Sequence, residues 1–275
     1  MKNFSSICAN EIESLCLGKF DAVHIGHQEL FSKLDAKGGV LIIDSLKPPY
    51  LTPNQEERIP HPCFKIELSK IKDKNHQEFA EFLKKNFPNL RKIIVGYDFR
   101  FGKDRSYSPK DLEEFFDVCL VDQVNLDGMA VHRQHIFQAL SQGQIKRANA
   151  MLGRIYSIKG KVISGQGRGK NECFPTLNLE TKDYVLPKSG VYATLSKIDG
   201  VEYKSVSFIG HRLSSDGEFA IETHLLGTCF EDKASEVEIF FLEFLRENEK
   251  FSSFEQLKAQ IAQDIARTQE ILFEI

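Results

Sequence analysis

The sequence predicts an α/β domain with a Rossmann-like parallel sheet, followed by a small antiparallel β-barrel with a C-terminal helix. In the first half of the chain, short apolar runs alternate with amphipathic stretches, which is typical of a parallel sheet covered by helices. From Ile155 onward, short β-rich runs follow one another without intervening helices, which favours a barrel. The change after Gly153 from alternating strands and helices to consecutive strands predicts two domains, 1–152 and 153–275.

The first domain is expected to alternate strands with helices. Its predicted strands are Ser14–Leu17, Val40–Ile43, Ile93–Val95 and Val118–Asp122, and its predicted helices are Gly26–Lys37, Gln77–Asn86 and Pro109–Phe116. Prolines crowd residues 45–62 and predict a loop there. A helix from about Val131 to Leu152 is expected to end the domain. In such a sheet, ligands bind at the carboxyl ends of the strands.

The second domain is expected to contain the barrel strands and one long helix. The predicted strands are Tyr156–Val162, Thr176–Leu179, Val191–Ile198, Lys204–Ile209, Glu218–Leu226 and Ser235–Leu245. Ser252 and Glu255 have the spacing of a capping box and predict the start of the helix. An apolar stripe from Phe254 to Leu272 then predicts that this helix packs on the barrel.

Composition and charge exclude several classes of protein. The chain of 275 residues can form two domains that each bury a core. Its formal net charge of −3 argues against a nucleic-acid binder, which needs a basic face. No apolar run approaches the length of a membrane span, and the first residues do not read as a signal peptide. The six cysteines lack C-x-x-C spacing, so we expect no zinc site and a cytoplasmic location. The sequence does not predict an oligomeric state.

Residues 17–27, Leu-Gly-Lys-Phe-Asp-Ala-Val-His-Ile-Gly-His, form the most informative stretch of the chain. They lie between a predicted strand and a predicted helix, where Gly18 lets the backbone approach a phosphate near free helix amides. His24 and His27 are three apart and face the same way, so both can hydrogen-bond charge that builds up on a phosphoryl group. A plain turn with two surface histidines explains this fixed spacing less well.

The pattern G-x-F-D-x-x-H-x-G-H resembles the nucleotidyltransferases with an H-x-G-H signature, and above all their FAD synthetase branch. Those enzymes use a nucleoside triphosphate and release pyrophosphate. The resemblance implies that His24 and His27 are catalytic and that Gly18, Phe20 and Asp21 bind the nucleotide. It covers the first domain only.

A glycine-rich, basic segment opens the second group of candidate site residues. Its spacing is not that of a P-loop, but a flexible basic loop suits phosphate, and a solvated hairpin loop is the alternative. The candidate nucleotide-binding residues in this segment are Gly165, Gly167, Arg168 and Gly169.

Thr176, Asn178 and Glu222 are the candidates for metal binding and proton transfer. Thr176 and Asn178 are two apart, so on a strand they share one face, and neutral oxygen ligands beside nucleotide phosphates suit Mg²⁺. Glu222 lies on a predicted strand, and a general base there would fit phosphoryl transfer to a hydroxyl. On its own, this glutamate reads equally well as a surface residue of a strand.

The pattern G-x-G-R-G…F-P-T-x-N, with Gly190-Val-Tyr-Ala193 and residues 245–251 further on, looks like riboflavin kinase. The resemblance implies that Thr176 and Asn178 bind Mg²⁺ with ATP and that Glu222 is the base for the ribityl 5′-hydroxyl. Both resemblances, in this order, are those of the bifunctional bacterial riboflavin kinase/FAD synthetases. They imply riboflavin, FMN and ATP as ligands and FAD as the product, while the net charge and the lack of a long apolar run lead us to expect neither nucleic acid nor membrane as a partner.

Residues 95–105 are similar to the V-G-x-D-F-x-F-G motif of the same family. This similarity implies that Gly96, Asp98 and Phe99 help bind the flavin side and the nucleotide. Arg105 could hold a phosphate or be a solvated charge.

The chain departs from the family pattern before the last helix of the first domain. The usual S-S-T-x-I-R turn is replaced by residues 130–137, which lack the hydroxyls. Arg133, with His132 and His135, is expected to substitute for them in binding the nucleotide. The usual F-x-P-H-P stretch also differs, at residues 45–50.

Three interpretations remain open from the sequence. The first is an enzyme that phosphorylates riboflavin to FMN in its C-terminal domain and adenylylates FMN to FAD in its N-terminal domain. The second is a riboflavin kinase whose adenylyltransferase domain is weakened or inactive. The third is a non-catalytic flavin-binding regulator. The intact His24, His27, Thr176, Asn178 and Glu222 favour catalysis.

Overall fold

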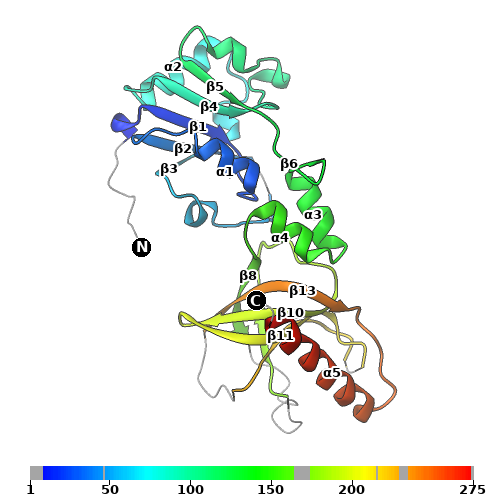
Figure 1. Cartoon of the computed structure of the whole chain (residues 1–275). Helices are drawn as coiled ribbons and strands as arrows, with labels where there is room; N and C mark the ends of the chain where they lie inside the picture. Colours follow the sequence, from blue (N-terminus) through cyan, green and yellow to red (C-terminus); the bar gives the residue numbers. More distant parts are fainter. Residues whose placement is uncertain (1–8, 46, 164–173, 215, 229–234, 274–275) are drawn as a thin grey trace. The chain divides into compact units, whose positions relative to one another are not determined.

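The computed structural model describes residues 9–45, 47–163, 174–214, 216–228 and 235–273 of the chain (Figure 1). The chain forms two compact units, Met1–Arg133 and Gln134–Ile275. The predicted fold class is confirmed, because the first unit contains a parallel sheet and the second a closed antiparallel barrel with a C-terminal helix. The boundary between residues 152 and 153 stays a prediction.

The first unit is built on a five-stranded parallel sheet with the order β3-β2-β1-β4-β5. Its strands are β1 (Ser14–Gly18), β2 (Gly38–Asp44), β3 (Cys63–Glu67), β4 (Lys92–Gly96) and β5 (Asp117–Val121). The chain runs outward from β1 through β2 to β3 and then returns to β4 on the other side of β1. This reversal creates a topological switch point at the carboxyl ends of β1 and β4, where ligands bind in such sheets.

Helices cover both faces of the sheet, and the side chains alternate between two apolar cores. Leu15 and Leu17 of β1 pack on one face with helix α2 (His76–Asn86), whereas Cys16 points to the other face with helix α1 (Ile25–Phe31). This alternation follows from the two-residue period of a strand. Because both faces are buried, β1 is a continuous apolar run.

Some predicted elements of the first unit were wrong in extent. Strand β3 was missed, because Pro60 and Pro62 precede it and masked a short pattern. Helix α1 ends at Phe31, where Ser32 is its C-cap residue, instead of reaching Lys37. The predicted helix at Pro109–Phe116 is one 3₁₀ turn, Pro109–Leu112. A short hairpin, β6 (Asn125–Leu126) with β7 (Met129–Ala130), follows the sheet.

The helix expected from Val131 to Leu152 is two helices, α3 (Arg133–Ser141) and α4 (Ile145–Leu152). Gly143 separates them with a φ of 74°, a left-handed conformation that ends a helix and that glycine adopts without strain. Asn149 of α4 fixes this helix to the barrel, since its amide donates to the Phe241 carbonyl at 2.9 Å and its oxygen accepts from the Tyr156 N–H at 2.7 Å. The two helices therefore fold largely with the second unit.

The second unit is a closed barrel with the strand order β10-β11-β12-β9-β8-β13. Its strands are β8 (Tyr156–Ile163), β9 (Leu177–Glu180), β10 (Gly190–Ile198), β11 (Val201–His211), β12 (Phe219–Leu225) and β13 (Glu236–Arg246). Part of the interior is polar, because fully buried hydroxyls on three strands hydrogen-bond one another at 2.8–3.0 Å. These residues are Thr194, Ser196, Ser205, Ser207 and Thr223. Every hydroxyl has a partner, so the network satisfies groups that would otherwise destabilise the core.

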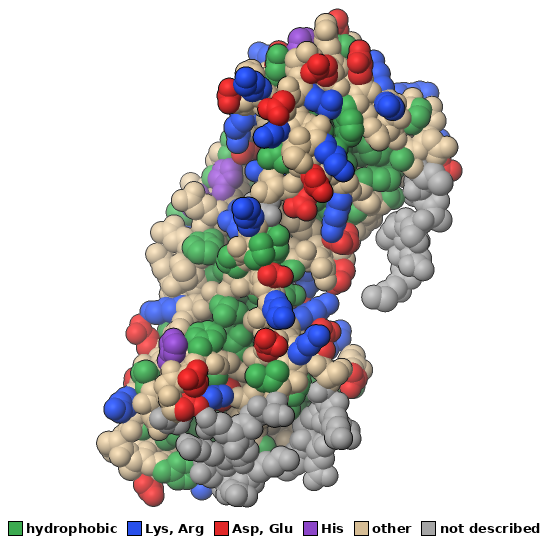
Figure 2. All heavy atoms as spheres, turned by 180° about the vertical axis from the view of Figure 1, so that it is seen from behind, with side chains coloured by type: hydrophobic (Ala, Val, Ile, Leu, Met, Phe, Trp, Pro, Cys, Tyr) green, Lys and Arg blue, Asp and Glu red, His purple; other side chains and the backbone are tan. Residues whose placement is uncertain are grey.

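Helix α5 (Phe254–Phe273) packs on β10 and β11. Its first turn is capped by Ser253, whose hydroxyl accepts from the Gln256 N–H, so the predicted capping box of Ser252 and Glu255 was wrong by one residue. On the face of the molecule shown in Figure 2, acidic and basic side chains are interspersed over the described surface. Such a surface suits ligands that are held by local charges.

Candidate functional sites

The first candidate site is the turn between β1 and α1. Phe20 and Val23 hold it in shape with positive φ angles of 51° and 45°, which are strained for these residue types. His24 is the N-cap of α1, and its Nδ1 accepts from the His27 N–H at 3.3 Å. The two imidazoles stack with ring centroids 3.6 Å apart. The predicted pair of histidines is therefore brought together by the turn itself.

Both glycines of the turn make room for side chains of the motif. A Cβ on Gly18 would lie 2.6 Å from Cζ of Phe20, and a Cβ on Gly26 would lie 3.1 Å from the His24 ring. Phe20 is buried and packs edge-on against His27, with ring centroids 5.1 Å apart. We expected Gly18 to let a phosphate approach the backbone. The structure shows a second reason for a glycine, because any larger residue at this position would clash with the Phe20 ring. The spacing of the motif thus encodes the packing of its own rings.

His27 is held in its neutral form. Burial lowers its pKa well below the usual value, and His24 and His132 lower that pKa further. Its Nδ1 is buried and has no hydrogen-bond partner among the described residues. A neutral imidazole with an unpaired ring nitrogen can hydrogen-bond a ligand that reaches this turn.

Asp21 lies under the turn and ties three segments together. It is buried; Oδ1 accepts from the Leu51 N–H at 3.0 Å and the Thr52 N–H at 3.4 Å. Oδ2 accepts from Nε of Arg133, whose Nη2 donates to the Pro49 carbonyl at 3.3 Å. Both residues were predicted to bind the nucleotide. In the structure they hold the turn, the proline-rich loop and the start of α3 in one arrangement, and a direct role in nucleotide binding stays a prediction.

The segment after β4 lies at the same edge of the sheet, because Gly96 ends β4 beside β1. The Phe99 N–H donates to the Gly96 carbonyl at 3.0 Å and closes a turn that exposes Asp98. Phe99 stacks on Phe101 and joins the apolar core. Nη2 of Arg105 donates to the Asp98 carbonyl at 3.3 Å. Contact of these predicted residues with a ligand stays a prediction.

A pocket at the carboxyl end of β2 was missed by the sequence analysis. Lys19, Asp44, Ser45, Tyr50 and Gln55 are among its lining residues. Ser45 Oγ and Gln55 Oε1 are buried without a hydrogen-bond partner among the described residues. Two such atoms in one pocket are candidates to bond a substrate. Only the position of this segment after a strand could have signalled the pocket.

The second candidate site lies on the barrel, where β9 and β12 pair. Asn178 is directly opposite Glu222 in the register of these strands. Thr176 lies just before β9, and the carbonyl of Pro175 contacts Nδ1 of His224 at 2.8 Å. Ile221 and Thr223 face the interior and are buried, so Glu222 between them lies on the outer face of the barrel. The structure thus brings the predicted metal ligand and the predicted base together. The predicted loop Gly165, Gly167, Arg168 and Gly169 lies outside the described residues.

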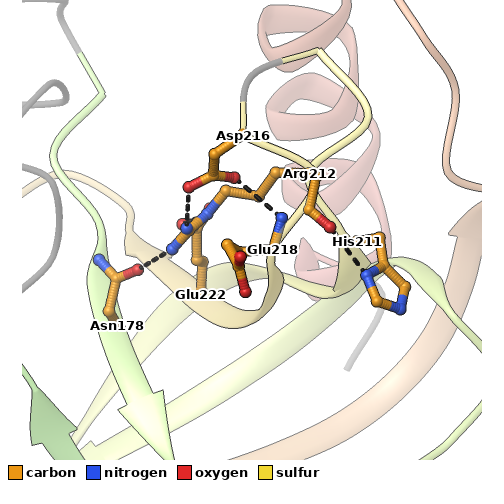
Figure 3. Close-up of polar contacts among 7 residues, drawn as sticks. Asn178, His211, Arg212, Asp216, Glu218 and Glu222 are labelled. Carbon is orange, nitrogen blue, oxygen red and sulfur yellow. Dashed lines mark hydrogen bonds and ion pairs between the residues drawn. The ribbon is translucent and has the colours of Figure 1, made fainter.

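Arg212 joins the pair and was missed by the sequence analysis (Figure 3). Its Nε donates to Glu222 Oε1 at 2.8 Å, its Nη2 to Asn178 Oδ1 at 2.8 Å, and its Nη1 to Asp216 Oδ2 at 3.1 Å. Arg212 follows β11, and the β11–β12 hairpin brings it back to Glu222. The short connection between these two predicted strands was the sequence signal that could have placed Arg212 near Glu222.

The donor atoms of this second site fit a magnesium ion. Asn178 Oδ1 and the Thr176 hydroxyl, the two predicted ligands, are oxygen donors, which Mg²⁺ prefers. Asn178 and Glu222 come from paired strand positions, so their side chains leave the sheet on one face. Within the described residues, no cluster of three or more His, Cys, Asp or Glu side chains with metal-binding geometry occurs.

Comparison with known proteins gives consistent matches over most of the chain. Residues 152–272 match the riboflavin kinase family, also described as flavokinase. The bifunctional riboflavin kinase/FMN adenylyltransferase of Listeria monocytogenes is 28% identical over 91% of this chain and 89% of its own length. The enzymes of the same description from Bacillus subtilis and Escherichia coli are 27% and 26% identical, each over 91% of this chain and 89% and 90% of their own.

A solved structure shares the fold. A crystal structure titled as a macrolide-efflux protein from Streptococcus pneumoniae has a TM-score of 0.85 and 26% identity, and the match covers 98% of this chain and 97% of that one. Every helix in the described part of this chain is too short or too polar to cross a membrane. The comparisons confirm the resemblance predicted from the motifs: over nearly its whole length, this chain is similar to the bifunctional riboflavin kinase/FMN adenylyltransferases of bacteria.

Proposed function

We propose that this chain is a bifunctional transferase that phosphorylates riboflavin to FMN in its second unit and adenylylates FMN to FAD in its first unit. The relatives described as bifunctional riboflavin kinase/FMN adenylyltransferases support both steps. In two of them, the match covers at least 89% of this chain and at least 89% of the relative. The observation that carries the kinase step is the cross-strand pairing of Asn178 with Glu222. The observation that carries the adenylyl step is the stacked pair His24 and His27 at the start of α1.

In the kinase step, Glu222 accepts the proton of the riboflavin hydroxyl that attacks the γ-phosphorus of ATP, and ADP leaves as the bond between its β-phosphate oxygen and the γ-phosphorus breaks. Asn178 and Thr176 would hold Mg²⁺ with the phosphates of ATP. The ion would neutralise phosphate charge there, as metal ions do in phosphoryl transfer. Binding of ATP and Mg²⁺ at these residues and a cytoplasmic location are part of the proposal.

In the adenylyl step, FMN attacks the α-phosphorus of ATP and pyrophosphate leaves. His24 and His27 lie at the amide-rich start of α1, where they would hydrogen-bond the charge that develops on the phosphate. The pocket with Ser45 and Gln55 lies near this turn, since Lys19 lines it. Its buried, unpaired oxygens are candidates to fix the second substrate.

The test is incubation of the protein with riboflavin, ATP and Mg²⁺, followed by chromatographic separation of riboflavin, FMN and FAD. We expect both FMN and FAD. Glu222→Gln should slow FMN formation by roughly 10²- to 10⁴-fold, the range for a positioned base, and should leave FAD formation from supplied FMN unchanged.

His24→Ala and His27→Ala provide the reciprocal control. Each should abolish FAD formation from FMN and spare FMN formation from riboflavin, because the two sites belong to separate units. FMN without any FAD from the wild type would instead establish a riboflavin kinase with an inactive first unit. Binding of flavin without either product would establish a regulator.

A further inference from the structure

Arg212 contacts both of the residues to which the kinase step is assigned. Its guanidinium donates to Glu222 and to Asn178 at 2.8 Å each, from a segment that belongs to neither β9 nor β12 (Figure 3). We infer that Arg212 is a positioning residue for phosphoryl transfer, which fixes the base and the metal ligand at a set spacing before substrates bind. This inference rests on the proposed kinase function of the second unit.

The geometry suits positioning, because one rigid group spans two strands. The guanidinium is planar, and its Nε and Nη2 point along fixed directions, so it sets the positions of both Oε1 of Glu222 and Oδ1 of Asn178. A glutamate on the outer face of a sheet otherwise samples several rotamers. Holding one oxygen of Glu222 leaves the carboxylate oriented, and an oriented base reacts far faster than a mobile one.

Asp216 and the turn between β11 and β12 in turn hold the guanidinium of Arg212 in place. Its Nη1 donates to Asp216 at 3.1 Å, and Asp216 Oδ1 accepts from the Glu218 N–H at 3.1 Å, which closes the turn between β11 and β12. The start of this turn is tied to the segment before α5, because the Phe251 N–H donates to Ser214 Oγ at 2.9 Å. The side chains of Arg212, Asp216 and Glu222 are only 21–23% exposed. The arginine therefore sits in a built network rather than in a passing surface contact.

The hydrogen bond from Arg212 to Asn178 should also oppose binding of Mg²⁺, and this opposition makes the positioning role testable. Asn178 Oδ1 is the atom that would ligate Mg²⁺, and it already accepts from a cation. Two positive groups on one oxygen repel each other, so Arg212 opposes metal binding while it orders the base. Removal of the arginine should therefore slow the transfer and tighten metal binding. A purely structural residue would weaken both.

The variants are Arg212→Met and Arg212→Lys, with Arg267→Met as the matched control. Arg267 is an arginine of the same unit that pairs with Glu270 on the exposed surface of α5, with both side chains at least 60% exposed. Initial rates of FMN formation give kcat and KM, and calorimetric titration with Mg²⁺ in the presence of ADP gives metal affinity without turnover. Thermal melting reports whether the second unit of the variant is folded, and FAD formation from supplied FMN reports whether the first unit is unaffected.

We expect Arg212→Met to lower kcat by roughly 10- to 100-fold, the value of one charge-assisted hydrogen bond to the base, with KM for riboflavin little changed. Metal affinity should rise by roughly 2- to 10-fold, as expected for one screened like charge. Arg212→Lys should keep wild-type metal affinity and recover part of kcat. Arg267→Met should match the wild type in every measurement.

An unchanged kcat in Arg212→Met, or a metal affinity that falls together with kcat, overturns the inference. If Arg212→Met does not fold, Arg212→Lys decides: wild-type kcat in that variant overturns the inference, because lysine lacks the fork that joins the two partners. Wild-type activity is measured first. If the wild type forms no FMN, the proposed function itself is refuted. If the wild type is active and substitution of Arg212 leaves kcat unchanged, only this inference is refuted.

Discussion

Asp21 and Arg133 form an ion pair although 112 residues separate them in the chain. The side chain of Asp21 is 1% exposed and the side chain of Arg133 is 40% exposed. The sequence led us to expect Arg133 as a replacement for the missing hydroxyls of the family's S-S-T turn. The structure gives its Nε a partner within the protein, so part of its charge serves to hold the turn that carries His24 and His27.

The pair predicts coupled effects of Asp21→Asn and Arg133→Gln on stability. Because the contact is charge-assisted but Arg133 is partly exposed, we expect a coupling energy of about 1–2 kcal/mol in a double-mutant cycle of urea unfolding. FAD formation should fall in each variant and FMN formation should not. If Arg133 instead acted only on phosphate, the two substitutions would show no coupling in stability, and Arg133→Gln alone would raise the KM for ATP.

Gly26→Ala tests the packing of the histidine pair. The new Cβ would lie 3.1 Å from the His24 ring, which is already stacked on His27 at 3.6 Å and has little room to move. We expect FAD formation to fall by roughly 10- to 100-fold, as small misplacements of catalytic groups do. Stability should change by no more than about 1 kcal/mol, because alanine is the better helix former at this position. Kinase activity is the internal control, and full FAD synthesis by Gly26→Ala would refute the packing role.

His27 predicts how stability depends on pH. Its pKa in the folded protein lies well below the usual value because of burial and of nearby His24 and His132. The unfolded chain takes up a proton near pH ~6.5 and the folded chain does not, so the contribution of His27 is complete above this pH and is lost as pH falls. The slope from this group approaches about 1.4 kcal/mol per pH unit. Urea unfolding at a series of pH values should show this loss, and His27→Gln should flatten it; an equal slope in both proteins would contradict the assignment.

The ion pair of Arg246 with Asp264 predicts where helix α5 is fastened. Arg246 donates to both carboxylate oxygens at 2.8–3.1 Å, and Asp264 is buried. Asp264→Ala leaves a largely buried arginine without its carboxylate, so we expect a loss of about 3 kcal/mol in unfolding free energy. The exposed pair of Arg267 and Glu270 is the control, and its loss should cost less than about 1 kcal/mol. Equal effects of the two would contradict a role of the Arg246–Asp264 pair in fastening α5.

The sequence by itself determined the fold class, a parallel sheet followed by an antiparallel barrel, together with the two sets of motif residues and the chemistry that they imply. These features are local: a two-residue period marks a strand, and the spacing of His24 and His27 places both imidazoles on one turn. Local pattern was insufficient where the signal was short, as for β3, or where one residue such as Gly143 broke a longer pattern.

Only the tertiary structure decided which distant residues meet. The pairing of Asn178 with Glu222 depends on the register of β9 and β12, and Arg212 reaches both through the β11–β12 hairpin. Likewise Asp21 meets Arg133 only because the sheet and the chain after β7 return to the same edge. Such contacts depend on strand register and on the packing of segments far apart in sequence, which no single stretch of the chain encodes.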